Sequence, residues 1–304
     1  MSEQVTVEVE GRRLRLSNLD KVLYPETGTT KAEVIDYYTR MAPVLLPHMA
    51  GRPLTVKRYP NGVEGGFFFE KNAPRGTPDW VRRVTLPAPG STKNRDEISY
   101  VVVEELATLV WLANLAALEL HTPQWTVGPR GGARGADQLV LDLDPGAPAT
   151  VVQCCQVALL LRDLLVADGL EPAAKTSGSK GLQVYAAVAE TPATRTSDYA
   201  HRLASALERE RPELVVSRMT KSLRPGKVLV DWSQNNAAKT TVTVYSLRAR
   251  PLPSVSTPVS WDEVETAAAG RDRLAFTKDD VLFRVHDDGD LFAPLLAPER
   301  PRLP

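Results

Sequence analysis

The stretch LVLDLDPG at residues 139–146 places two carboxylates in an apolar run that ends at a proline and a glycine. Alternate residues of a β-strand point to one face of a sheet, so Asp142 and Asp144 share a face and the leucines beside them enter the core. Two neighbouring carboxylates repel unless a cation lies between them, and such oxygen ligands suit Mg²⁺ or Mn²⁺. In a plainer alternative, Asp144 forms a turn or caps the next helix and Asp142 is merely exposed.

A third aspartate has a similar setting in LVDWSQN at residues 229–235, where Asp231 ends a short apolar run. Three carboxylates on strands meet the needs of two-metal phosphoryl transfer. Two of them bridge both ions, and the third holds the ion that activates the attacking hydroxyl. This hypothesis requires Asp231 to meet Asp142 and Asp144 in space, although it lies far along the chain.

Phosphate-binding candidates surround these aspartates. The loop TSGSKG at residues 176–181 offers hydroxyls, backbone N–H groups and an ammonium that can wrap a triphosphate, although such a loop is also common as a surface turn. A basic set brackets Asp231 and favours binding of a polyanion over a merely solvated face. This set consists of Lys221, Arg224, Lys227, Lys239, Arg248 and Arg250.

Overall composition gives no support to nucleic-acid binding, because Lys+Arg and Asp+Glu both number 37 in 304 residues. Any such function must therefore rest on local clusters of charge. Cys154 and Cys155 are adjacent in an apolar helical pattern and are expected to be reduced core residues. With no signal core and no membrane-length apolar run, we expect a cytoplasmic, nucleoid-associated protein without a membrane partner.

Hydrophobic periodicity predicts a mixed α and β protein. Capping boxes at residues 30–33 and 260–263 begin two of the predicted helices. Further helices are predicted after residue 104 and near 150–168 and 196–210. Strands are predicted at 5–9, 12–17, 53–60, 65–71, 98–104, 172–176, 182–188, 227–232 and 240–247.

Several segments in fixed order resemble one family, the polymerase domain of bacterial ATP-dependent DNA ligase D, in the archaeo-eukaryotic primase superfamily. They are HTPQW (121–125), LDLDPG (141–146), TSGSKGLQVY (176–185), MTKSLRPGKVLVDWSQN (219–235) and YSLRARP (245–251). The resemblance runs from LSNLDKVLYPETGTTK (16–31) to beyond residue 250, so it covers nearly the whole chain.

This resemblance implies one α+β primase-polymerase domain over residues 1–304. An N-terminal lobe, 1–105, would bind the DNA end. A catalytic lobe, 106–250, would carry an RRM-like antiparallel or mixed sheet, and a helical region would follow at 251–304. The implied activity is template-directed addition of NTPs or dNTPs, with ribonucleotides preferred, at breaks and gaps in non-homologous end joining. The implied cofactors are two Mn²⁺ or Mg²⁺ ions.

By motif match, Asp142, Asp144 and Asp231 would be catalytic and hold the metal ions. The incoming nucleotide would contact Lys57, His121, Ser177, Lys180, Gln183, Gln234 and Arg248. His121 could bind a phosphate or the ribose 2′-OH, or it could be structural. Gln183 departs from the related motif, which commonly reads S-G-S-K-G-L-H, because glutamine can donate a hydrogen bond but carries no charge and shuttles no proton.

The resemblance also implies partners: DNA ends with a 5′-phosphate, either gapped or with a 3′ overhang, the end-binding protein Ku, and an ATP-dependent DNA ligase. Lys21 and Lys31 would bind the 5′-phosphate beside Asn18, helped by free N–H groups at the start of the helix. Two phenylalanines would stack on template bases, although alternation along FFF predicts at least one core residue. The expected DNA contacts are Asn18, Lys21, Lys31, Arg58, Phe68, Phe69, Lys221 and Arg224.

Three other functions remain open from the residues. A primase-like polymerase would start chains without a primer, and a non-catalytic module would only bind and align DNA ends. A metal phosphohydrolase is more remote, because the sequence lacks the His and Asp ligand clusters usual for dinuclear hydrolases.

Overall fold

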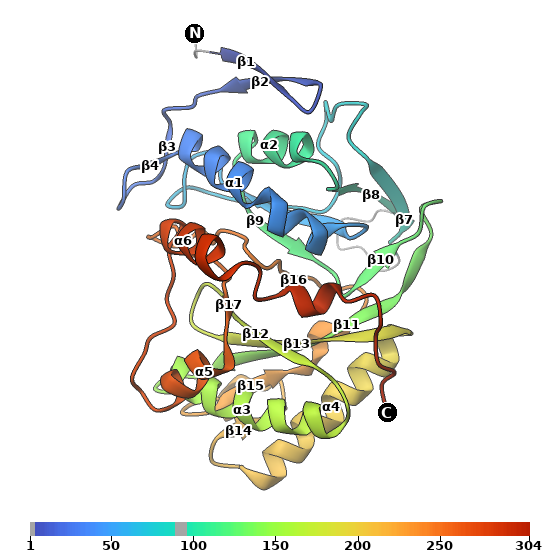
Figure 1. Cartoon of the computed structure of the whole chain (residues 1–304), viewed down its shortest axis with the longest axis vertical. Coiled ribbons are helices and arrows are strands. Elements are labelled where there is room, and N and C mark those ends of the chain that lie inside the picture. The colour runs from blue at the N-terminus through green and yellow to red at the C-terminus, as the bar shows by residue number, and fades with distance from the viewer. Residues whose placement is uncertain (1–3, 89–95) are drawn as a thin grey trace.

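The computed structural model describes residues 4–88 and 96–304, and two sheets organise them (Figure 1). The first has six strands in the order β16-β9-β5-β8-β7, with β6 paired to β5. Its members are β5 (Pro53–Arg58), β6 (Phe68–Glu70), β7 (Arg83–Pro87), β8 (Glu97–Val102), β9 (Ala117–Thr122) and β16 (Thr241–Val242).

The second sheet has seven strands in the order β14-β15-β11-β13-β12-β17, with β10 paired to β11. Its members are β10 (Trp125–Val127), β11 (Ala133–Pro145), β12 (Pro172–Thr176), β13 (Leu182–Thr191), β14 (Val215–Val216), β15 (Val228–Asp231) and β17 (Pro258–Val259). Its pairs are antiparallel except for the parallel pair β14–β15. The predicted antiparallel or mixed sheet is therefore confirmed.

Helices cover the outer sides of the two sheets (Figure 1). Residues of α1 (Lys31–Met49) and α2 (Leu106–Asn114) share a core with β5 and β9. Residues of α3 (Val151–Ala167) and α4 (Ala193–Glu210) share another core with β11 and β13. The remaining elements are β1 (Gln4–Val9), β2 (Arg12–Ser17), β3 (Val22–Tyr24), β4 (Thr29–Thr30), α5 (Trp261–Ala268), α6 (Lys278–Asp288) and the 3-10 helices η1 (Lys221–Leu223), η2 (Trp232–Asn235) and η3 (Ala293–Leu296).

Alternation along β11 orients the central strand. Leu139, Leu141 and Leu143 are fully buried against α3 and α4, whereas Val140 belongs to the core shared with the six-stranded sheet. The side chain of Asp142 has the same parity as Val140 and therefore points toward the six-stranded sheet. The predicted division of β11 between a leucine face and an aspartate face is confirmed.

Several other predictions hold. The capping boxes at Thr30 and Ser260 are both formed. Cys154 and Cys155 are buried and unbridged.

Along the described residues, the helices are too short or too polar to span a bilayer.

Two predicted elements differ. The strand expected at 240–247 is reduced to β16, because Tyr245 takes a left-handed conformation with φ of 62° that interrupts extended structure. The helix expected after residue 104 ends at Asn114, and Ala116 at φ 56° turns the chain into β9. Both α2 and β9 pack with the first sheet, so residues 106–122, which the sequence assigned to the catalytic lobe, lie with the elements of the first lobe.

Candidate active site

The three aspartates predicted as metal ligands face one side of the seven-stranded sheet. Asp142 on β11 is the direct cross-strand partner of Asp231 on β15, and Asp144 lies two residues further along β11. Side chains at directly opposed positions and at i+2 share a face, so the antiparallel register brings together residues that are 89 positions apart in the chain. Asp144 does not cap the next helix, because Thr150 is the N-cap of α3.

Burial and the neighbouring carboxylates raise the pKa values of Asp142 and Asp144. Burial, Asp144 and Asp231 together raise the pKa of Asp142 to about 7, although a hydrogen bond from Gln183 opposes the rise. Burial and Asp231 also raise the pKa of Asp144, against the charges of Lys180, Arg224 and Arg248. The two strands therefore present negative charge that the surrounding protein only partly compensates.

Asp231 is the N-cap of η2 and accepts hydrogen bonds from residues of that 3-10 helix. Its Oδ1 accepts hydrogen bonds from the backbone N–H of Ser233 (3.0 Å) and from the Ser233 hydroxyl, and its Oδ2 accepts one from Gln234 Nε2 (2.8 Å). Lys239 Nζ lies 4.0 Å from Oδ2. Gln234, which is predicted to contact the nucleotide, donates to Asp231 in the free protein.

The three carboxylates fit a divalent metal ion in two respects: their oxygen chemistry and their position on one face of the sheet. All three offer hard oxygen donors, which Mg²⁺ and Mn²⁺ prefer. Across residues 4–88 and 96–304, however, no three His, Cys, Asp or Glu side chains already converge into a metal site. Both carboxylate oxygens of Asp231 accept hydrogen bonds, from Ser233 and from Gln234.

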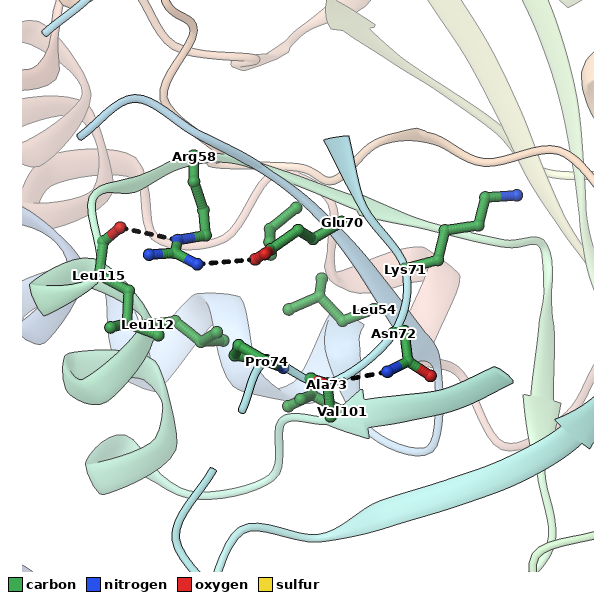
Figure 2. Close-up of a pocket in the computed structure, with 11 residues that line it drawn as sticks. Leu54, Arg58, Glu70, Lys71, Asn72, Ala73, Pro74, Val101, Leu112 and Leu115 are labelled. Carbon is green, nitrogen blue, oxygen red and sulfur yellow. Dashed lines mark hydrogen bonds and ion pairs between the residues drawn. The ribbon is translucent and has the colours of Figure 1, made fainter. Parts of the chain in front are cut away.

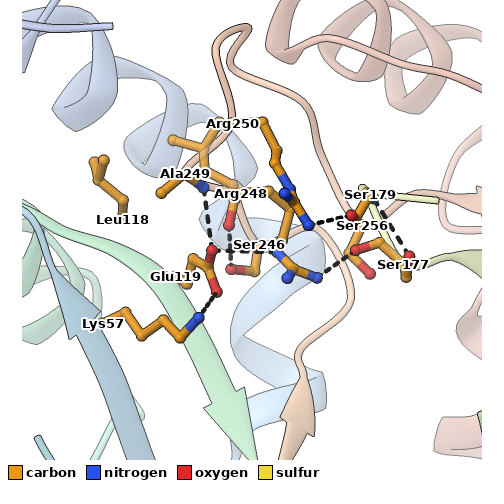
Figure 3. Close-up of polar contacts among 12 residues, drawn as sticks. Lys57, Leu118, Glu119, Ser177, Ser179, Ser246, Arg248, Ala249, Arg250 and Ser256 are labelled. Carbon is orange, nitrogen blue, oxygen red and sulfur yellow. Dashed lines mark hydrogen bonds and ion pairs between the residues drawn. The ribbon is translucent and has the colours of Figure 1, made fainter. Parts of the chain in front are cut away.

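A buried glutamate on the six-stranded sheet organises several predicted nucleotide contacts (Figure 3). Glu119, 2% exposed, lies 3.3 Å from Lys57 Nζ, 3.0 Å from His121 Nε2 and 3.4 Å from Arg248 Nε. Burial alone would raise its pKa, but the His121 hydrogen bond and the charges of Arg248 and Lys57 hold that pKa well below the usual value. Sequence reasoning missed Glu119, although the E-x-H spacing in LELHT puts it on the same strand face as His121.

The hydrogen bond to Glu119 also defines what His121 can recognise. Burial lowers the pKa of His121 despite the opposing effect of Glu119, so the imidazole is neutral at pH 7. Because the ionised carboxylate accepts, Nε2 carries the proton and donates, and Nδ1 is left as an acceptor. An acceptor nitrogen can bind a hydroxyl group, which donates a hydrogen bond, but not an ionised phosphate, which only accepts. Of the two ligands that the sequence allows for His121, this favours the ribose 2′-OH over a phosphate.

The glycine-rich loop after β12 is held against this cluster. Ser177 Oγ accepts hydrogen bonds from the N–H groups of Ser179 (3.3 Å) and Gly181 (3.1 Å), and Arg248 Nη1 donates to the Ser177 carbonyl (2.5 Å). Arg248 thus joins the loop to Glu119 on the opposite sheet (Figure 3). Gly178 adopts φ of 64°, and a Cβ there would lie 2.6 Å from Arg248 Cγ, so the loop requires glycine.

Space for an anion lies beside this loop. A cavity of about 1050 Å³ is lined in part by Ser179, Lys180 and Arg250. Lys180 is exposed, and its Nζ lies 3.4 Å from the carbonyl of Pro145, immediately after the paired aspartates. The structure thus brings the predicted Ser177, Lys180 and Arg248 into one basic cluster near Asp144.

The two lysines predicted to bind a 5′-phosphate lie close enough to interact. Lys31, only 5% exposed, donates from Nζ to the Ser17 carbonyl, and Lys21 Nζ donates to Asn61 Oδ1 (3.0 Å). Burial and the charge of Lys21 lower the pKa of Lys31 to about 8. Asn18, in a left-handed turn with φ of 53°, accepts from the Lys21 N–H through its carbonyl (3.1 Å).

The expectation of free N–H groups at this helix start is wrong. The N–H groups of Lys31 and Ala32 donate to the carbonyls of Lys21 and Leu19, both at 2.9 Å, and the N–H of Glu33 donates to Thr30 Oγ1. Any anion here would depend on the two ammonium groups.

The phenylalanine run lies at the surface. Phe67, Phe68 and Phe69 are 55%, 58% and 43% exposed, so the expected core residue among them does not exist. Along the described residues, β6 pairs with β5 alone and lies outside the main strand order of its sheet. Phe67 stacks on Tyr59 at 5.4 Å, and the Phe69 ring lies 6.1 Å from that of His121, which places the aromatic run beside the Glu119 cluster.

Arg58 turns inward, away from the surface. Its Nε donates to the Leu115 carbonyl and its Nη1 to Glu70, both at 2.9 Å, and its side chain is 19% exposed (Figure 2). In the free protein the charge of Arg58 is therefore paired with Glu70.

The two basic residues before Asp231 differ in setting. Lys221 is exposed on η1. Arg224 donates to the Met219 carbonyl (2.6 Å), and its charge acts on Asp144. Of this predicted DNA-binding pair, only Lys221 therefore stands clear at the surface.

Comparisons with known proteins agree with this geometry. The family model described as LigD, primase-polymerase domain, matches residues 30–292. The multifunctional non-homologous end joining protein LigD of Mycolicibacterium smegmatis is 47% identical over 285 residues, covering 93% of this chain and 36% of the relative. The bifunctional non-homologous end joining protein LigD of Bacillus subtilis is 32% identical over 279 residues, covering 91% of this chain and 43% of the relative.

A solved structure extends the agreement to the fold. The polymerase domain from Mycobacterium tuberculosis ligase D in complex with DNA superposes with a TM-score of 0.88 at 44% identity, covering 94% of this chain and 99% of that one. Fold and site therefore define a DNA-directed nucleotidyltransferase. Within that class, the chain belongs to the LigD primase-polymerase domain family. It spans little more than a third of the M. smegmatis relative, so it corresponds to one part of that longer protein.

Proposed function

We propose that this chain adds nucleotides, preferably ribonucleotides, to 3′ ends at DNA double-strand breaks and gaps during non-homologous end joining. The observation that carries the proposal is the cross-strand meeting of Asp142 and Asp231 with Asp144 beside them, on a face where burial and repulsion raise the pKa of Asp142 to about 7. Such a face is poor for stability and suited to cations.

In this proposal the three aspartates hold two Mn²⁺ or Mg²⁺ ions. When bound, these ions neutralise the triphosphate and lower the pKa of the attacking 3′-hydroxyl. The chain's own cations complete the anion site: Lys180 and Arg248 would face the triphosphate, and Ser177 belongs to the loop that carries Lys180 and accepts a hydrogen bond from Arg248. Lys57, Gln183 and Gln234 complete the predicted nucleotide set, and Gln234 becomes available once it leaves Asp231.

The preference for ribonucleotides rests on His121. Its Nδ1 is an acceptor because Nε2 donates to Glu119, and a ribose 2′-OH can donate to it while a deoxyribose cannot. A site built to bond a hydroxyl discriminates against the analogue that lacks it.

The N-terminal residues would hold the DNA end. Lys21 and Lys31 supply the charge for a 5′-phosphate, with Asn18 in the adjoining turn, and Lys221 would add an exposed contact. Phe68 and Phe69 are exposed on β6 and could stack on template bases without sequence preference. Ku and an ATP-dependent DNA ligase are the proposed partners, and an enzyme acting on broken chromosomes would work at the nucleoid.

Single-nucleotide addition tests this function. The substrate is a 5′-phosphorylated one-nucleotide gap, supplied with each NTP or dNTP and with Mn²⁺ or Mg²⁺. We expect one templated addition and faster reaction with the NTP. Equal rates for NTP and dNTP would contradict the role of His121, and absence of any addition would contradict the proposed function. A template without primer separates this activity from priming.

A further inference from the structure

A buried lysine ends a row of polar side chains that crosses the seven-stranded sheet. Lys175 on β12 is the cross-strand partner of Gln183 on β13, and Gln183 is the partner of Asp142 on β11. Asp142 in turn opposes Asp231 on β15, so the four side chains occupy one level and one face of the sheet. Lys175 is only 1% exposed and is absent from the sequence-predicted site.

Burial lowers the pKa of Lys175 to about 7, although the charge of Asp142 opposes this. In its protonated form the ammonium has three protons, one for each of the three acceptors that it contacts. It donates to Gln183 Oε1, to the Val242 carbonyl (3.0 Å) and to Ser256 Oγ (2.7 Å). The Ser256 hydroxyl is already committed as a donor to the Thr176 carbonyl (2.8 Å), so its oxygen accepts from the lysine. This arrangement makes Lys175 a fixed donor, since an ammonium has no acceptor capacity.

A fixed donor on one side defines the orientation of the Gln183 amide. Its oxygen must face Lys175, so its NH₂ group faces Asp142 and donates to Oδ1 at 3.0 Å. Without the lysine, the amide could rotate by half a turn and place its oxygen against the carboxylate, where two acceptors repel. Rotation would release the Asp142 carboxylate from its present orientation, because it would break the hydrogen bond from Gln183.

We propose that Lys175 is a positioning residue that acts through Gln183 to hold the Asp142 carboxylate in the orientation that binds a divalent metal. The inference rests on the proposed role of Asp142 as a metal ligand. It also defines which side chains can occupy position 183: each must accept from Lys175 and donate to Asp142. Glutamine does both, as does a neutral imidazole, whereas leucine does neither and an ionised glutamate only accepts.

The direct test measures Mn²⁺ binding to the whole chain by electron paramagnetic resonance of free Mn²⁺, with no nucleotide or DNA present. Partners that orient a metal ligand change affinity by about 10-fold to 100-fold when replaced. We therefore expect Lys175→Met to weaken Mn²⁺ binding about tenfold and to lower kcat for nucleotide addition, with the KM for NTP changed less than about twofold. Lys278→Met is the matched control: its side chain is 12% exposed and pairs with Glu33 and Asp279.

A double-mutant cycle separates positioning from a general structural effect. If Lys175 acts only through Gln183, the double variant Lys175→Met with Gln183→Leu binds Mn²⁺ as Gln183→Leu alone does. Full additivity of the two losses would overturn the proposal, as would Mn²⁺ binding by Lys175→Met equal to that of the wild type. Wild-type protein that neither binds Mn²⁺ nor adds nucleotides would instead refute the proposed function itself.

Variants at position 183 keep the proposal testable if Lys175→Met does not fold, as judged by circular dichroism and thermal melting. Gln183→His is expected to keep Mn²⁺ affinity within about threefold of the wild type, and Gln183→Glu to lose about tenfold or more. Equal behaviour of these two variants would overturn the proposal.

Discussion

The two sheets that form the site hold their charges in opposite ways. On the six-stranded sheet, one buried carboxylate, Glu119, lies among Lys57, His121 and Arg248. On the seven-stranded sheet, three carboxylates face one side, and the pKa of Asp142 rises to about 7. The pKa of Glu119 is lowered and those of Asp142 and Asp144 are raised, although burial acts on all three in the same direction.

This difference indicates what each half of the site needs. In the Glu119 cluster the carboxylate is already paired with basic side chains. It can therefore orient the lysine, the histidine and the arginine before any substrate binds. The aspartate face is incomplete without added positive charge, and its present form is less stable for that reason. Substitutions in the two halves should therefore change stability with opposite signs.

The largest effect is expected from Asp142→Asn. Loss of a metal ligand should reduce nucleotide addition at least about a thousandfold, measured by primer extension on a gapped duplex with Mn²⁺. The same variant should raise the free energy of unfolding by about 1 kcal/mol in EDTA at pH 8. The folded pKa of Asp142 is raised to about 7, so its ionisation destabilises the fold fully above pH 7, and this penalty fades as the pH falls toward 3.8.

Asp163→Asn, on the exposed face of α3 with its side chain 68% accessible, serves as the control and should change stability by less than about 0.5 kcal/mol. Urea denaturation at pH 8 and at pH 4 would reveal the sign and its pH dependence. A lower free energy of unfolding for Asp142→Asn than for the wild type at pH 8 would contradict the proposed repulsion between Asp142 and the other two aspartates.

Glu119→Gln should act in the opposite direction. Removing the carboxylate leaves Lys57 and Arg248 as partly buried like charges without their partner, which should lower the free energy of unfolding by about 2 kcal/mol at pH 7. Because the folded pKa of Glu119 lies below 4.5, its stabilisation is present above pH 4.5 and is lost as the pH falls further. Nucleotide addition should fall about tenfold to a hundredfold, mainly through KM for the nucleotide.

The exposed Glu265→Gln is the matched control, because Glu265 pairs with Arg162 at the surface with its side chain 53% accessible. Equal unfolding free energies for Glu119→Gln and the wild type would mean that the cluster is not held together by its carboxylate. An unchanged KM for the nucleotide with a reduced kcat would contradict a role of Glu119 in nucleotide binding.

The contrast also shows what the sequence could and could not predict. Asp142 and Asp144 were predictable because strand alternation is local, and Asp231 because it ends a similar run. Glu119 has the same kind of local pattern in LELHT, but a single carboxylate on a strand is a weaker indication of a site than two. Lys175 could not be predicted from the sequence, because its partner Gln183 is defined by the cross-strand register between β12 and β13 rather than by spacing along the chain.

Side-chain directions were the least predictable feature. Arg58 adjoins Lys57 on β5, yet its guanidinium turns to Leu115, at the end of α2, because that carbonyl and Glu70 offer it acceptors. The N–H groups at the start of α1 were expected to be free, but the loop that carries Lys21 folds back and accepts from them. Both outcomes depend on contacts between segments far apart in sequence.

The N-terminal lysines offer a third kind of site: among the described residues, Lys21 and Lys31 donate to an amide oxygen and a carbonyl rather than to a carboxylate. Replacing Lys21 and Lys31 by alanine should weaken binding to 5′-phosphorylated gaps about tenfold and leave 5′-hydroxyl gaps within about twofold. Fluorescence anisotropy on the two substrates measures this, with Lys278→Ala as the control. Equal losses on both substrates would assign the lysines to general DNA binding.

The smallest effect is a pH dependence of that 5′-phosphate preference. Burial and Lys21 lower the pKa of Lys31 to about 8, so Lys31 is charged in the free protein below pH 8 and neutral above it. A bound phosphate favours the charged form, so binding above pH 8 requires uptake of a proton and weakens by at most about tenfold per pH unit. The ratio of affinities for 5′-phosphate and 5′-hydroxyl ends should therefore be constant from pH 6.5 to 7.5 and fall by several-fold at pH 9. In Lys31→Arg the guanidinium stays charged throughout, and the ratio should not change with pH, whereas a fall of the same size in that variant would attribute the effect to another group.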